Sequence, residues 1–145
     1  MTLSNLAQYL QYIAKKGDYD NAEPLFRRAL VITEQALGTD HPDTGTSLSN
    51  LALLLHEKGD YDVAEPLFRR ALAIAEQALG LNHPKTGTYL NNLAVLLNNK
   101  GDYDAAEPLY LRALAIVEHG LGPDHPDTKL CLENLRDLQK DMRVV

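Results

Sequence analysis

The sequence predicts an all-α solenoid of about seven helices, in which three helical hairpins are followed by a C-terminal cap helix. Three observations support this prediction. The tetrapeptide Gly-Asp-Tyr-Asp begins at Gly17, Gly59 and Gly101, so the chain repeats itself at a constant offset of 42 residues. Glycine and proline divide each period into two stretches with a helical spacing of apolar residues. No stretch alternates apolar and polar residues as a half-buried strand does.

The second period illustrates how the residues specify two helices. An apolar face at intervals of three and four residues predicts a helix over 43–58, formed by Leu48, Leu51, Ala52 and Leu55. Gly59 can end this helix because glycine tolerates a left-handed backbone. Asp62 and Glu65 have the spacing of a capping box, so Pro66 is expected in the first turn of a second helix over 62–79.

The same signals divide one domain, residues 1–145, into its elements. We predict helices over 3–16, 20–37, 43–58, 62–79, 85–100, 104–121 and 127–142. The repeats then cover about 2–43, 44–85 and 86–127, and the cap helix about 128–143. The cap helix is polar and carries Arg136 where the corresponding earlier helices have alanine, as expected at the end of a stacked array.

The first helix departs from the pattern. Ser4 lies 13 residues before Gly17, whereas the equivalent Ser49 lies 10 residues before its glycine. Without a gap in the alignment, this helix presents an apolar stripe of Tyr9, Tyr12 and Ile13. We interpret the stripe either as an altered N-terminal cap or as a contact surface for a second subunit or a neighbouring molecule.

Composition excludes several classes of function. The chain has 14 Lys and Arg against 20 Asp and Glu, a formal net charge of −6, which disfavours binding of nucleic acid or anionic membranes through bulk charge. The single Cys131 excludes an intramolecular disulfide and a multi-cysteine zinc site. The sequence contains neither a run long enough for a membrane span nor a signal peptide, so we expect a cytoplasmic protein.

The sequence contains no catalytic or metal-binding constellation, and we expect neither an enzyme nor a cofactor. Three histidines precede proline at one position of each period and are spread along the array, which favours a helix-start or loop-packing role over a metal site: His41, His83 and His125. Cys131 is expected to be a small packed thiol. Arg27 and Arg69 follow Glu23 and Glu65 by four residues, which indicates ion pairs on a solvated face rather than a nucleic-acid-binding stripe.

The small and aromatic positions of the period resemble the tetratricopeptide repeat. They are an alanine in the first helix, a Gly-Asp-Tyr turn, and an alanine, an aromatic residue and a second alanine in the second helix, namely Ala52, Ala64, Phe68 and Ala71, repeated as Ala94, Ala106, Tyr110 and Ala113. The 42-residue length, together with Asn91-Asn92-Leu93-Ala94, resembles the kinesin-light-chain variety of this repeat. The resemblance covers nearly the whole chain and implies that the first helices of the repeats line a concave face on which peptides lie.

The resemblance implies which residues line this face. They lie on the first helix of each repeat and on the cap helix: Gln8, Gln11, Lys15, Thr46, Ser49, Asn50, Leu53, His56, Thr88, Asn91, Asn92, Val95, Asn98, Asn99 and Asn134. Asn50, Asn92 and Asn134 form a ladder at the 42-residue period. Because side-chain amides both donate and accept, the ladder fits either an extended peptide backbone or hydrogen bonds between neighbouring helices.

These residues favour a non-enzymatic scaffold that binds a protein or peptide. Thr88 and Asn92 occupy positions where related clamps for a C-terminal carboxylate have cations, and only Lys15 adds a positive charge clearly inside the face. Glu133 and Asp137 are expected to repel acidic ligands, so an extended segment that is neutral or partly basic is the expected partner.

Self-association is the alternative function. Nearly identical repeats allow head-to-tail stacking of copies or exchange of the N-terminal helix, either of which gives a homo-oligomer. The sequence leaves open whether the chain is a fragment of a longer array or an engineered repeat protein.

Overall fold

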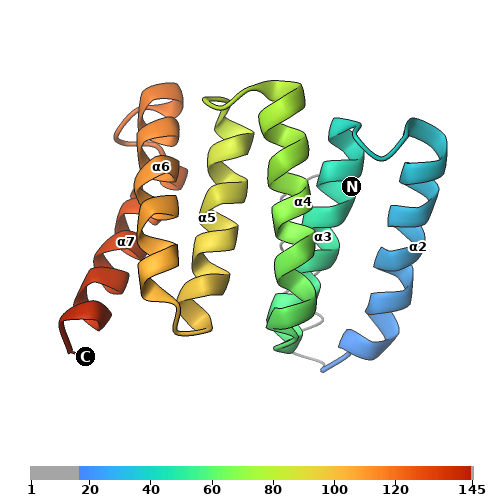
Figure 1. Cartoon of the computed structure of the whole chain (residues 1–145), viewed down its shortest axis with the longest axis horizontal. Helices are drawn as coiled ribbons and strands as arrows, with labels where there is room; N and C mark the ends of the chain where they lie inside the picture. Colours follow the sequence, from blue (N-terminus) through green and yellow to red (C-terminus); the bar gives the residue numbers. More distant parts are fainter. Residues whose placement is uncertain (1–16, 145) are drawn as a thin grey trace.

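Six helices and their short connections make up residues 17–144, the part of the chain that this computed structural model describes (Figure 1). The helices are α2 Tyr19–Leu37, α3 Pro42–Lys58, α4 Tyr61–Leu79, α5 Pro84–Asn99, α6 Tyr103–Leu121 and α7 Pro126–Val144. Each begins and ends within two residues of its prediction. The helix predicted over 3–16 lies outside the described residues.

The helices follow one another along the long axis of the molecule, with α2 and α7 at its two ends (Figure 1). Successive helices contact each other, and α3–α4 and α5–α6 form the most extensive pairs. Helix α5 also contacts both α3 and α7, so these three helices share one face of the array. No strand occurs in residues 17–144. The predicted all-α solenoid is therefore confirmed.

Histidine starts three of the helices. The Nδ1 atoms of His41, His83 and His125 each accept a hydrogen bond from the amide two residues later, at 3.0, 3.0 and 3.1 Å. The proline that follows each histidine occupies the first helical position, where no intrahelical amide bond is required. Of the two predicted roles, helix start and loop packing, these contacts show the helix-start role.

The predicted capping box at the start of α4 is wrong. Asp60, not Asp62, is the N-cap residue, and its side chain makes no capping hydrogen bond. Glu65 instead binds cations of α4 and α5. Because the helix begins at Tyr61, Pro66 is its sixth residue and lies beyond the first turn. Two aspartates flank Tyr61, and the helix starts after the earlier of them.

Small residues allow the two helices of a hairpin to pack closely. Ala52 of α3 and Ala64 of α4 are fully buried, as is Phe68 beside them. A Cβ atom built on Gly87 in α5 would lie 3.0 Å from side-chain carbons of Ile116 and of the neighbouring valine of α6. The paired helices therefore approach so closely that their contact positions require alanine or glycine.

Lysines join consecutive repeats. The Nζ atom of Lys58, at the end of α3, lies 2.9 Å from Asp20 and 3.2 Å from Glu23 of α2. The Nζ atom of Lys100, directly after α5, lies 2.9 Å from Asp62 and 3.0 Å from Glu65 of α4. These contacts link residues about one repeat apart.

The arginines predicted to form ion pairs within a helix do so. Arg27 lies 2.9 Å from Glu23, and Arg69 lies 3.0 Å from Glu65. A hydrogen bond from Arg27 holds the pKa of Glu23 below its usual value, and a hydrogen bond from Lys58 makes a smaller contribution in the same direction. Hydrogen bonds from Lys100 and Arg69 do the same for the pKa of Glu65.

Helix α7 has one face that packs on the preceding repeat and one face that is exposed. Thr128, Cys131, Leu135 and Leu138 are buried, whereas Arg136 is exposed. Burial, with a smaller contribution from a nearby aspartate, raises the pKa of the Cys131 thiol to about 11. The predicted packed thiol is therefore confirmed.

Candidate functional site

The face that α3, α5 and α7 share carries most of the predicted ligand-binding residues of the described chain. Ser49 and Asn91 are buried beneath this face. The remaining predicted residues are half-buried or exposed: Thr46, Asn50, Leu53, His56, Thr88, Asn92, Val95, Asn98, Asn99 and Asn134. The other predicted residues lie outside the described part of the chain: Gln8, Gln11 and Lys15 of the face, and Tyr9, Tyr12 and Ile13 of the apolar stripe.

The asparagine ladder divides into two kinds of residue. The Nδ2 atom of Asn134 in α7 donates to Oδ1 of the buried Asn91 in α5, over 3.3 Å, and so links neighbouring helices. Asn50 and Asn92 are half-buried and form no side-chain hydrogen bond with any residue of 17–144. Within the described part of the chain, the amides of Asn50 and Asn92 therefore retain their capacity to donate and accept.

Each of these two asparagines is followed along its helix by an aliphatic residue on the same face. Leu53 and Val95 occupy equivalent positions three residues after Asn50 and Asn92. Both are half-buried and pack against the hydrophobic core while leaving part of their surface open. The centre of the face thus combines amide and aliphatic surface, without charge at these four positions.

Lys85 is a residue of this face that the sequence analysis missed. Its Nζ atom donates to Oγ1 of Thr46 across the α3–α5 boundary at 2.6 Å and lies 5.9 Å from the centre of the Tyr89 ring. The ammonium group forms no ion pair with a residue of 17–144. The equivalent positions in α3 and α7 are Asp43 and Asp127, so a reversal of charge at one repeat position is the signal that identifies Lys85.

The C-terminal ends of α3 and α5 meet at His56. Its Nε2 atom lies 2.6 Å from Nδ2 of Asn99, and its ring contacts those of Tyr61 and Phe68 with centroids 5.3 and 6.4 Å apart. The Asn99 amide donates if His56 is neutral with a free Nε2 lone pair. Burial lowers the pKa of His56 below its ordinary value, which favours this neutral form.

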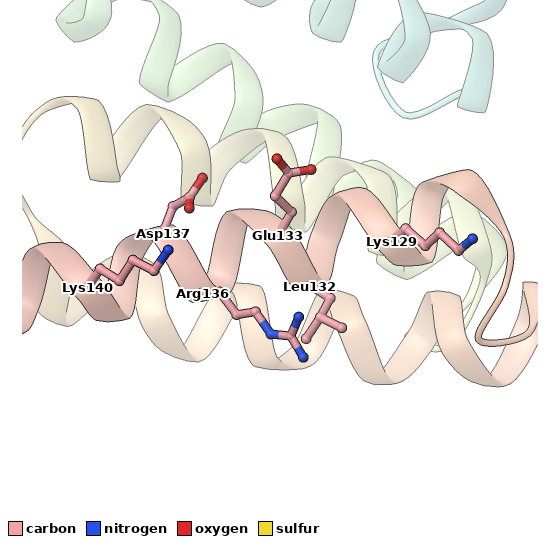
Figure 2. Close-up of a pocket in the computed structure, with 6 residues that line it drawn as sticks. All are labelled: Lys129, Leu132, Glu133, Arg136, Asp137 and Lys140. Carbon is pink, nitrogen blue, oxygen red and sulfur yellow. The ribbon is translucent and has the colours of Figure 1, made fainter.

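The α7 side of the face is acidic. Glu133 and Asp137 are exposed, and they project from one side of α7 whereas Leu132 and Arg136 project from the other (Figure 2). Asp141 is also exposed. A ligand that reaches this part of the face meets carboxylates rather than cations.

Residues 17–144 contain neither a metal-binding cluster nor a membrane-spanning helix. No group of three or more histidine, cysteine, aspartate or glutamate side chains in this region is arranged to hold a metal ion. None of its helices combines the length and the apolar composition that crossing a membrane requires.

Comparison with known proteins identifies the family of this array. The model of the tetratricopeptide repeat family matches residues 1–77, 46–116 and 85–140. The chain belongs to the tetratricopeptide repeat family. No curated protein sequence matches the chain significantly.

Solved tetratricopeptide structures share the fold. A crystal structure of the nearly identical TPR-like repeats of a candidate kinesin light chain from Podosopora anserina has a TM-score of 0.82 at 22 % identity, over 94 % of this chain and 64 % of that chain. BtubC (BKLC) from P. vanneervenii has a TM-score of 0.81 at 27 % identity, over 97 % of this chain and 55 % of that chain. The 42-residue repeats are thus similar to those of kinesin-light-chain-like tetratricopeptide proteins, and the chain spans less than two thirds of either structure.

A third solved structure is also similar in fold. PcrH, solved in complex with the chaperone binding region of PopD, has a TM-score of 0.64 at 16 % identity, over 97 % of this chain and 92 % of that chain. At this identity the similarity concerns the fold.

Proposed function

We propose that this tetratricopeptide chain is a non-enzymatic, cytoplasmic scaffold that binds an extended protein segment on the face formed by α3, α5 and α7. The observation that carries the proposal is the pair Asn50 and Asn92, which are half-buried at equivalent positions and make no side-chain hydrogen bond within residues 17–144. Paired amides one repeat apart suit the alternating donors and acceptors of an extended backbone. The amide of Asn134 already donates to Asn91 and is therefore less available to a ligand.

The charges of the face favour a neutral or partly basic segment. Glu133, Asp137 and Asp141 lie on α7, and the whole chain has a net charge of −6. Lys85 is the exception, and it suits a single acidic or carbonyl group of the ligand near α3. The PcrH complex with a region of PopD supports protein segments as the class of partner, since that fold is similar.

A peptide array that varies net charge tests the proposal. The wild-type protein is compared with Asn50→Ala/Asn92→Ala and with the control Asn82→Ala, which removes an amide from an exposed loop outside this face. We expect the double variant to lose binding by about tenfold, because each lost amide bond contributes roughly 0.5–1.5 kcal/mol. Binding that is equal in all three proteins contradicts the proposal.

Self-association is a second candidate, favoured by the surface of α2. Within the described part of the chain, Leu25 and Ile32 of this helix are 59 % and 56 % exposed, so α2 presents large apolar side chains at its surface. We propose that copies of the chain associate through this end of the array. Light scattering at several concentrations tests the idea, and a monomer at every concentration excludes it.

A further inference from the structure

The exposed side of α7 differs from the equivalent sides of α3 and α5. In α3, a Cβ atom on Gly45 would lie 3.3 Å from Cγ2 of Ile74 in the following helix. In α7 the equivalent residue is Lys129, which is exposed. The fully buried Ala52 of α3 is likewise replaced by the exposed Arg136. At these two positions α3 packs closely against the following helix, whereas α7 bears long cationic side chains.

The two cationic replacements, Lys129 and Arg136, lie on the same side of the helix. The side that packs on the preceding repeat keeps its apolar residues, since Leu135 and Leu138 are buried like the equivalent Leu51 and Leu54 of α3. On the face shared with α3 and α5, Asp137 replaces the aliphatic residue of the earlier repeats, whereas Lys129 and Arg136 lie on the side that would receive a following helix. A further helix of the same kind could approach as closely as Gly45 and Gly87 allow only by displacing the Lys129 side chain.

The cations of α7 form a continuous strip. Lys129, Arg136 and Arg143 are spaced at seven residues, and Lys140 follows Arg136 by four, so all four share one side of the helix. All four are exposed, and none forms an ion pair with another residue of 17–144. We call these four residues the α7 basic strip. It extends over about 21 Å of helix.

The α7 basic strip borders an open hollow. The hollow has a volume of about 340 Å³ and is lined by Lys129, Leu132, Glu133, Arg136, Asp137 and Lys140 (Figure 2). Leu132 projects beside Arg136 and offers an apolar contact among the charges (Figure 2). Helix α7 carries four cations and four carboxylates, and the four cations lie together along one side of it.

We propose that the α7 basic strip docks an acidic, helical segment of another protein. Carboxylates spaced at four and three residues along such a segment would face the four cations, and one apolar side chain would pack on Leu132. Glu133 and Asp137, beside the strip, disfavour a nucleic acid or an anionic lipid surface, both of which require denser and uncompensated positive charge. The four cations of this surface are not among the residues of the face formed by α3, α5 and α7, although Glu133 and Asp137 border both surfaces.

The probe is a fluorescent synthetic helical peptide of Glu, Ala and Leu, with about four turns and its glutamates on one side. Fluorescence anisotropy compares the wild-type protein with Arg136→Glu/Lys140→Glu. The control Arg28→Glu/Arg112→Glu makes the same change in net charge at two exposed arginines away from the strip that form no ion pair within residues 17–144. Circular dichroism verifies that each variant keeps its helical content.

We expect the strip variant to lose affinity by about tenfold or more, and the control by much less. Binding should also weaken as salt rises, since the contact is electrostatic. An equal loss in the control, or the absence of binding to the wild-type protein, overturns the proposal. Tighter binding of single-stranded DNA or phosphatidylserine vesicles than of the acidic peptide also overturns it.

Discussion

The ammonium group of Lys100 lies 3.0 Å from Oε1 of Glu65 and so joins α5 to the preceding repeat. The equivalent pair, Lys58 and Glu23, repeats the contact one period earlier. The equivalent position in α7 is Met142, which is half-buried against the core. The contact therefore belongs to the internal repeats and is not made by the terminal helix within residues 17–144.

Replacing Lys100 by methionine, as in α7, should weaken this junction. Glu65 loses the first of the two hydrogen bonds that lower its pKa, although Arg69 remains. A carboxyl group with a lowered pKa stabilises the fold above its unfolded pKa, and this stabilisation is lost as pH falls through the folded pKa. Urea unfolding at several pH values between about 6 and 3 should show a shallower loss of stability in Lys100→Met. The control Lys140→Met removes an exposed lysine without an ion pair in the described chain, and an equal effect there contradicts the prediction.

Gly87 should be intolerant of a large side chain. Its Cβ position lies 3.0 Å from Cγ2 of Ile116 and from Cγ1 of Val117, within the fully packed α5–α6 pair. We expect Gly87→Leu to lower the free energy of unfolding by about 1–3 kcal/mol through overpacking. The matched control Lys129→Leu alters the equivalent exposed position of α7 and should change stability by less than about 0.5 kcal/mol. Thermal unfolding measures both, and equal stabilities contradict the prediction.

Sequence reasoning located the helices because their start and end signals are local. Proline follows each of the three histidines, and the predicted starts at 43, 85 and 127 differ by one residue from the observed starts at Pro42, Pro84 and Pro126. The start of α4 was less determined, since Asp60 and Asp62 are both suitable N-cap residues. Local composition could not decide between them.

Contacts between repeats were harder to predict. The pairing of Lys58 with Asp20 depends on which helix ends meet in space, and no sequence spacing specifies that. Lys85 was missed because it lies outside the positions that the family resemblance supplied. The ladder of Asn50, Asn92 and Asn134 was found from its period, but whether each amide has a partner depends on side-chain geometry.

Overpacking at the crossing of α3 and α4 should also destabilise the fold. Ala64 and its equivalent Ala106 are fully buried. We expect Ala64→Leu or Ala106→Leu to reduce the free energy of unfolding by about 1–3 kcal/mol, as measured with urea. The control Ala73→Leu lies on the exposed side of α4, at the position where α2 has Val31, and should have little effect. An unchanged stability of Ala64→Leu would refute the assignment of this alanine to the helix crossing.

His56 should make the stability of the array depend on pH. Burial lowers its pKa in the folded state, whereas the unfolded chain has the ordinary value of 6.5. The unfolded state therefore binds more protons in the window below pH 6.5, and stability should fall as pH decreases through this window. Glu57, whose charge raises the pKa of His56, reduces the effect without reversing it, and the Asn99, Tyr61 and Phe68 side chains that face the ring are uncharged.

His56→Asn, which copies the equivalent Asn98, isolates this contribution. Urea unfolding at about pH 7.5 and 5.5 should show a smaller loss of stability in His56→Asn than in the wild-type protein. The control His119→Asn changes an exposed histidine near the end of α6 and should keep the wild-type pH dependence. The opposite pattern, in which His119→Asn alone flattens the pH dependence, would mean that the buried imidazole is not the titrating group. Because His56 contacts both α4 and Asn99 of α5, protonation would weaken packing within one hairpin and the junction with the next.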